Sequence, residues 1–184
     1  GFIAVGIIWF VLSAFGALPF FFDGRFGGYI NCFFESVSGF TTTGSTILAD
    51  IEILPRGILW WRSFTHFIGG MGILVLANAI LPKAKDKSHY LLRAEVPGPM
   101  SDKYVPRLSA SSQISYCIYV AITLIQVICL LFTGIELYDA FVISFSTAGT
   151  GGFAVKNASI AGYNNIAVEY ICSIFMLVFS VNFN

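Results

Sequence analysis

Charge is scarce in this sequence. Only 11% of its 184 residues are charged and 57% are hydrophobic, whereas an ordinary soluble domain carries about 25% charged residues. A chain of this length cannot enclose so much apolar surface in one core that faces water. The composition therefore predicts a protein embedded in a lipid bilayer.

Side chains that perform catalysis or bind metals are also few. The chain has 4 cysteines and 2 histidines, no CxxC pair, and no cluster of His, Cys and carboxylates suited to a transition metal. No glycine-rich phosphate-binding loop precedes a predicted helix. The sequence therefore indicates neither an enzyme nor an organic cofactor, and we expect no nucleic-acid partner.

Long runs without charge support the bilayer. Gly1–Phe22 and Leu108–Ile135 contain no charged residue, and each exceeds the roughly 20 residues that span a hydrocarbon core. Two further apolar segments are residues 57–82 and 170–184. We therefore predict an all-α polytopic membrane protein with four membrane-crossing helices.

The charges that are present divide by region. The segment 83–107 holds six basic residues and three acids, whereas residues 23–56 and 136–169 together hold seven acids and three basic residues. By the positive-inside rule, segment 83–107 is cytoplasmic. The acidic segments then lie on the outer, non-cytoplasmic side of the cell (inner) membrane, where they attract cations.

The chain contains an internal repeat. A shift of 108 residues places Ser38 on Ser146 and Gly44 on Gly152 without gaps, and both segments lie between apolar spans. Because the linker returns to the cytoplasmic side, the two halves run in the same direction. We expect such parallel repeats to pack around an axis normal to the membrane, where a pore can form.

Each half holds a short helical segment, 29–40 or 138–147, that is too short to span a bilayer. Each segment ends in a stretch rich in Thr, Ser and Gly, and non-helical backbone at membrane depth must line a wet cavity or be buried in protein. The negative end of each helix and neutral backbone oxygens favour a cation such as K⁺. Ordinary extracellular loops are the alternative. The predicted filter residues are Thr42, Thr43, Gly44, Ser45, Thr150, Gly151, Gly152 and Phe153.

The same residues resemble a known family. Phe34–Thr46 is similar to the first pore loop of the Trk/Ktr/HKT superfamily of potassium transporters, and residues 54–73 are similar to the helix that follows it. Residues 94–107 resemble a linker of the bacterial TrkH-type branch. Residues 144–153 and Asn182-Phe183 match the second repeat.

The resemblance implies potassium uptake through a filter built from four repeats in one polypeptide, of which this chain holds two. The implied domains are a first repeat at 1–81, a cytoplasmic linker at 82–108 and a second repeat at 109–184. It also implies a homodimer and gating by a cytosolic nucleotide- or NAD-binding regulatory subunit. Gly44 and Gly152 correspond to the filter glycines, whereas Gly149 is an extra glycine.

Four polar residues are predicted to support the filter: Glu35, Arg62, Asp139 and Asn182. A charge at the bilayer centre is costly unless it is paired, so Arg62 is expected to pair with Glu35 or with pore-helix carbonyls. Asp139 suits either a helix N-terminus or the mouth of a pore. His66 is expected to be a packing residue held by hydrogen bonds, with proton coupling as the alternative, and Gly69, Gly70 and Gly72 are expected to allow close helix contact.

Two other functions remain compatible with the sequence. A secondary transporter of an organic solute is expected to have inverted repeats and polar residues within its spans. A non-conducting structural or assembly subunit is the other alternative. Flux through the full-length protein in liposomes separates these interpretations.

The charge distribution makes a prediction about topology. A cysteine introduced at Ser101 should resist an impermeant thiol reagent in intact cells, because the basic linker is cytoplasmic. A cysteine at Ala158 should react with the same reagent. The reverse labelling pattern would contradict the proposed orientation.

Overall fold

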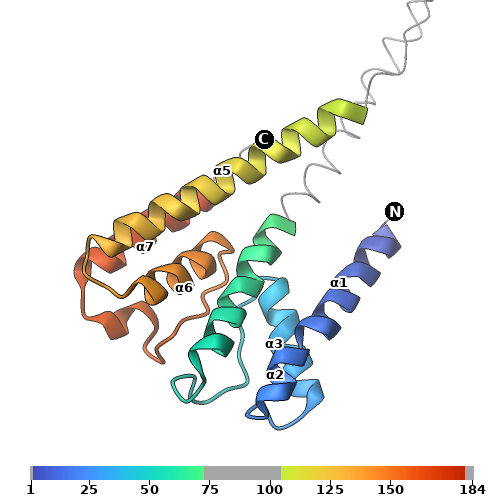
Figure 1. Ribbon diagram of the computed structural model, residues 1–184, viewed down its shortest axis with the longest axis horizontal. Helices are drawn as coiled ribbons and strands as arrows, with labels where there is room; N and C mark the ends of the chain where they lie inside the picture. The colour runs from blue at the N-terminus through green and yellow to red at the C-terminus, as the bar shows by residue number, and fades with distance from the viewer. Residues whose placement is uncertain (1, 73–104, 181–184) are drawn as a thin grey trace, which may run out of the picture.

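The computed structural model describes residues 2–72 and 105–180, which form helices and connecting loops without a strand (Figure 1). A further helix, residues 56–72, lies between α3 and α5 in chain order. The named elements are α1 (Phe2–Gly16), α2 (Leu18–Asp23), α3 (Tyr29–Phe40), α5 (Val105–Leu131), α6 (Leu137–Ala148), the 3₁₀ helix η1 (Ser159–Tyr163) and α7 (Ile166–Ser180).

Two helical segments of the described chain are long and apolar enough to cross a membrane: Gly6–Asp23 and Gln113–Leu131. The first is made of α1 and α2, and Pro19 lies in the first turn of α2, where its missing N–H costs no hydrogen bond. The predicted spans 57–82 and 170–184 extend beyond the described residues. So does most of the predicted linker, although α5 already begins at Val105, before the linker's predicted end.

The helices form two groups. In the first, α3 packs against α1 and α2, and in the second, α6 packs against α5 and α7 (Figure 1). The helix of residues 56–72 lies between α6 and the first group in this view. Each short helix, α3 or α6, thus packs against at least one longer helix.

Several polar side chains are buried in this structure, and many large apolar ones are exposed. Glu35, Arg62, His66 and Gln126 are fully buried, whereas large apolar side chains on α1, α5 and α7 are exposed. Water-soluble monomers rarely expose apolar surface on this scale, and an extensive exposed patch marks contact with a membrane or with other protein. The described helices therefore suit a lipid environment.

Loops of the two halves are joined by Asn157. Its backbone N–H donates to Glu52 Oε1 at 2.9 Å, and its side-chain Nδ2 donates to Asp50 Oδ1 at 2.7 Å. Its Oδ1 accepts from the backbone N–H of Ile51 at 2.9 Å. One amide side chain and its backbone therefore hold three consecutive residues of the loop 41–55.

A second connection between the halves involves Arg56 at the start of the helix 56–72. Its guanidinium forms two parallel hydrogen bonds with the Glu136 carboxylate, at 2.6 and 2.8 Å, and these raise the pKa of Arg56. The hydroxyl of Tyr138 donates to the backbone carbonyl of Arg56 at 2.5 Å. The pair is exposed, so it aligns the halves more than it stabilises them.

Candidate functional site

The two Thr/Gly loops begin in the same way. The helices that precede them, α3 and α6, have bounds that differ by 108 residues at both ends. Three backbone N–H to carbonyl hydrogen bonds also recur at this offset. In the first loop they run from Thr41 to Val37, from Thr42 to Gly39 and from Thr43 to Ser38. In the second loop they run from Gly149 to Phe145, from Thr150 to Thr147 and from Gly151 to Ser146. The sequence repeat therefore corresponds to a repeated helix-to-loop geometry.

Both loops hold an uncommon backbone conformation at equivalent positions. Thr42 and Thr150 have φ of 55° and 54°, and Gly44 and Gly152 have φ of 75° and 87°. Positive φ is rare for a β-branched residue such as threonine and costs about 1–3 kcal/mol, so it persists where the surrounding structure imposes it. Two such threonines at one offset indicate a shared structural requirement.

The same angles identify the counterpart of Gly44 in the second loop. Gly152 shares its left-handed conformation, whereas Gly149 has φ of −78°. Any residue adopts the conformation of Gly149. The additional glycine of the second loop is therefore not equivalent to Gly44.

The two loops meet directly. A β-carbon at Gly44 would overlap the backbone carbonyl oxygen of Gly151, so the loops are in backbone contact at this point. A β-carbon at Gly152 would have no heavy atom of the described residues within 4 Å. Within the described residues, the two loops therefore differ: Gly44 has a close neighbour and Gly152 has none.

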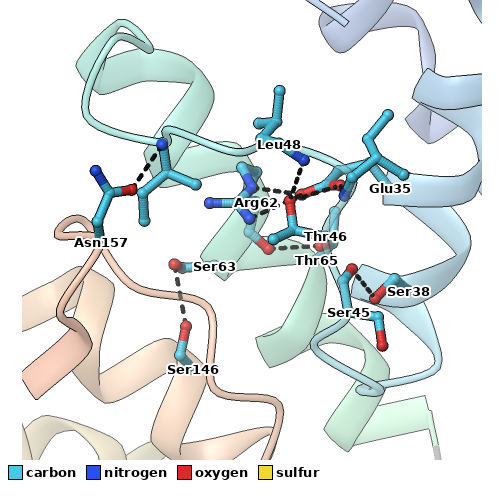
Figure 2. A network of polar contacts seen from close by, with 12 residues as sticks. Glu35, Ser38, Ser45, Thr46, Leu48, Arg62, Ser63, Thr65, Ser146 and Asn157 are labelled. Carbon is cyan, nitrogen blue, oxygen red and sulfur yellow. Dashed lines mark hydrogen bonds and ion pairs between the residues drawn. The ribbon is translucent and has the colours of Figure 1, made fainter.

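A buried ion pair supports the first loop (Figure 2). Arg62 Nη2 lies 2.7 Å and Arg62 Nε 2.8 Å from Glu35 Oε1, and both side chains are almost completely buried. Thr46 Oγ1 donates to the same carboxylate at 2.9 Å, and the backbone N–H of Ile47 donates to it at 3.4 Å. Of the two partners expected for Arg62, the structure therefore shows Glu35, and the pair holds the loop just beyond Gly44.

Two predicted filter residues, Ser45 and Phe153, are held by contacts with the rest of the protein. The hydroxyl of Ser38 donates to the backbone carbonyl of Ser45 at 2.6 Å (Figure 2). Phe153 as a whole residue is 4% exposed, and the guanidinium carbon of Arg62 lies 4.1 Å from the centroid of its ring, a cation–π contact. The side chain of Phe153 is therefore packed within the protein.

The helix 56–72 contacts both loop segments. The hydroxyl of Ser146 donates to that of Ser63 at 3.0 Å (Figure 2). A β-carbon at Gly69 would lie 3.0 Å from Thr42 Cγ2, and one at Gly70 would lie 3.1 Å from the Cα of Gly149. The expected close approach at these glycines is present, and it joins the helix to both loops.

Of the two other predicted supporting residues, the structure describes one. Asp139 lies in the first turn of α6, where a carboxylate favours the helix N-terminus. Asn182 lies outside the described residues. Sequence reasoning did not identify Thr46 or Ser63, because hydroxyl residues are common here and nothing in their spacing distinguishes them.

The buried ion pair makes a prediction about stability. Arg62→Gln removes the cation and leaves the Glu35 carboxylate buried without its partner, which costs about 3–5 kcal/mol. We expect a large loss of folded protein and a lower thermal midpoint in detergent. The matched control is Arg56→Gln, which removes an exposed ion pair from the same helix and should leave the midpoint nearly unchanged. Normal folding of Arg62→Gln together with an altered ion preference would instead place Arg62 in the conduction path.

Known proteins are similar to this chain in sequence and in fold. All of it, residues 1–184, matches the TrkH family model, described as a cation transport protein. It is 41% identical over 185 residues to the Trk system potassium uptake protein TrkH of Escherichia coli strain K12. It is 39% identical over 186 residues to the protein of that name from Halomonas elongata.

Each alignment covers 100% of this chain but only 38% or 39% of the relative. The crystal structure of the potassium transporter TrkH from Vibrio parahaemolyticus is similar to this structure, with a TM-score of 0.82 and 35% identity. The match covers 100% of this chain and 36% of the transporter. The chain therefore belongs to the TrkH family of cation transport proteins and spans less than two fifths of the length of these relatives.

Proposed function

We propose that the protein takes up potassium ions and that this chain supplies two adjacent quarters of their selectivity filter. The observation that carries the proposal is the contact between two loops with equivalent strained backbones, at Gly44 and Gly151. Such strain clusters at functional sites. A ring of backbone carbonyls needs this close approach of neighbouring segments.

The proposed ligands are backbone oxygens of residues 42–45 and 150–153. Each segment follows the C-terminus of a short helix, α3 or α6, and the partial negative charge there favours a cation. The buried Arg62 does not repel this cation strongly, because Glu35 neutralises it at 2.7 Å. Potassium is the preferred ion because the relatives are named as potassium uptake proteins.

The wider assembly follows from the family resemblance. We propose tandem parallel helix–pore loop–helix repeats in the cell (inner) membrane, with the filter mouth outside and segment 83–107 in the cytoplasm. Ion flow is then passive, in a homodimer gated by a cytosolic nucleotide- or NAD-binding subunit. The acidic loop residues Asp50 and Glu52 lie at the end where the halves are joined, which suits attraction of cations to the mouth.

Flux in liposomes tests this function against its rivals. The full-length protein should pass K⁺ down its gradient and prefer it to Na⁺. A structural subunit passes neither ion, and a broken-helix transporter requires an organic solute.

The backbone angles make a prediction about selectivity. Gly44→Ser forces a side chain into positive φ and against the Gly151 carbonyl, which displaces a potassium ligand. We expect the K⁺/Na⁺ flux ratio to fall about tenfold, equivalent to about 1.4 kcal/mol. Gly152→Ser should lower the ratio by less, because only its backbone angle is unfavourable within the described residues.

Gly57→Ser is the matched control. Among the described residues, this glycine has no heavy atom within 4 Å of its β-carbon position, and its φ is not positive, so the substitution should leave the flux ratio unchanged. Dimer yield by size-exclusion chromatography verifies assembly of each variant. An unchanged ratio for both Gly44→Ser and Gly152→Ser would show that these loops are not the filter.

A further inference from the structure

His66 occupies an unusual position behind the two loops. Its side chain is fully buried on the helix 56–72, one turn beyond Arg62. Its ring stacks on Phe153 with centroids 4.1 Å apart and planes inclined by 24°. Neither ring nitrogen makes a hydrogen bond of good geometry among the described residues, although the ring interacts with the Ser38 backbone. A buried polar ring with so little hydrogen bonding is costly, so its packing against the loops is the main feature of its position.

Two glycines of the second loop pack against this single residue. A β-carbon at Gly149 would overlap the backbone carbonyl of His66 and lie 3.0 Å from the His66 Cβ. A β-carbon at Gly151 would overlap the Cε1, Nδ1 and Cγ atoms of His66, and so would overlap the face of the imidazole ring. Neither glycine has a positive φ. The lack of space beside His66, and not the backbone conformation, therefore excludes a side chain at both positions.

The contact continues to the first loop. Gly151, whose Cα faces the imidazole, is also the residue whose carbonyl oxygen packs against Gly44. The three residues form one sequence of contacts: imidazole ring, Gly151 backbone, Gly44 backbone. Because packed interiors deform little, a change in the ring displaces the carbonyl that separates the two loops.

We propose that His66 is a positioning residue that sets the place of the Gly151 carbonyl and thereby determines ion selectivity. This inference rests on the proposed filter function. The ring acts by its flat shape and volume, held between Phe153 and the glycine backbone. It touches no ion itself.

The first experiment removes the ring. In the full-length protein in liposomes, His66→Ala should lower the K⁺/Na⁺ flux ratio about tenfold, equivalent to about 1.4 kcal/mol. His66→Leu has nearly the same volume and suits an apolar interior, so it provides a folded variant that lacks the flat ring. Its flux ratio should also fall.

The matched control is Phe64→Ala. Phe64 lies on the same helix and packs on an aromatic ring of the second half, Phe145, with centroids 5.7 Å apart. It has no stacking contact with Phe153 among the described rings. The loss of the Phe64 ring should lower stability and leave the flux ratio unchanged. If His66 had only a structural role, His66→Ala would likewise lower stability and leave the flux ratio unchanged.

A double-mutant cycle tests the route through Gly151. Gly151→Ala places a methyl group against the imidazole and should lower the flux ratio by itself. In the combined His66→Ala, Gly151→Ala variant, the methyl group occupies the space that the ring leaves. The loss of selectivity should then be smaller than the sum of the two single losses, because contacting residues are not additive.

The outcomes separate this inference from the function on which it rests. Unchanged flux ratios in assembled His66→Ala and His66→Leu, alongside a lowered ratio in Gly44→Ser, overturn the role of His66 and leave the filter in place. Additive losses in the cycle overturn the route through Gly151. An unchanged ratio in both Gly44→Ser and Gly152→Ser removes the filter function and this inference with it.

Discussion

The ion pair between Arg62 and Glu35 is the interaction on which the arrangement of both loops depends. Two charges in a dry interior must be paired and must satisfy their remaining hydrogen-bonding capacity, or the structure loses several kcal/mol. Glu35 meets this requirement with Thr46 and the Ile47 backbone, and Arg62 meets part of it with the face of Phe153. The buried ion pair is thus in contact with residues from both halves of the chain.

A second constraint follows from the proposed filter, whose ligands would be backbone oxygens. A site made of backbone oxygens cannot adjust by rotating a side chain, so its geometry depends on φ and ψ and on what packs behind the loop. The left-handed Thr42 and Thr150 store strain, and only firm contacts maintain such strain. The helix 56–72 supplies many of these contacts through its glycines, Ser63 and His66.

Local features of this fold could be predicted from the sequence. The short helix before the first loop occupies Tyr29–Phe40, as its apolar pattern indicated, and the second exceeds its predicted range by one residue at each end. The offset of 108 residues recurs in the loop hydrogen bonds. These features depend on neighbours along the chain, which a sequence displays directly.

Contacts between the halves could not be predicted in the same way. The contacts Ser63–Ser146 and Gly44–Gly151 depend on how two segments far apart in the sequence pack together. The residues of one segment do not indicate which residues of the other they contact. The role of Gly149 was also hidden, because a glycine needed for space and a glycine needed for positive φ look alike in a sequence. The backbone angle separates the two cases.

The contact between Gly44 and Gly151 also has a consequence for biosynthesis. The first loop is complete only when a residue about one hundred positions later reaches it, and chains elongate at about 5–20 residues per second. Synthesis of Gly151 therefore follows that of Gly44 by roughly 5–20 s. Glu35 and Arg62 are both synthesised well before Gly151. During that interval the ion pair, formed entirely within the first half, is what keeps two charges from facing lipid unpaired.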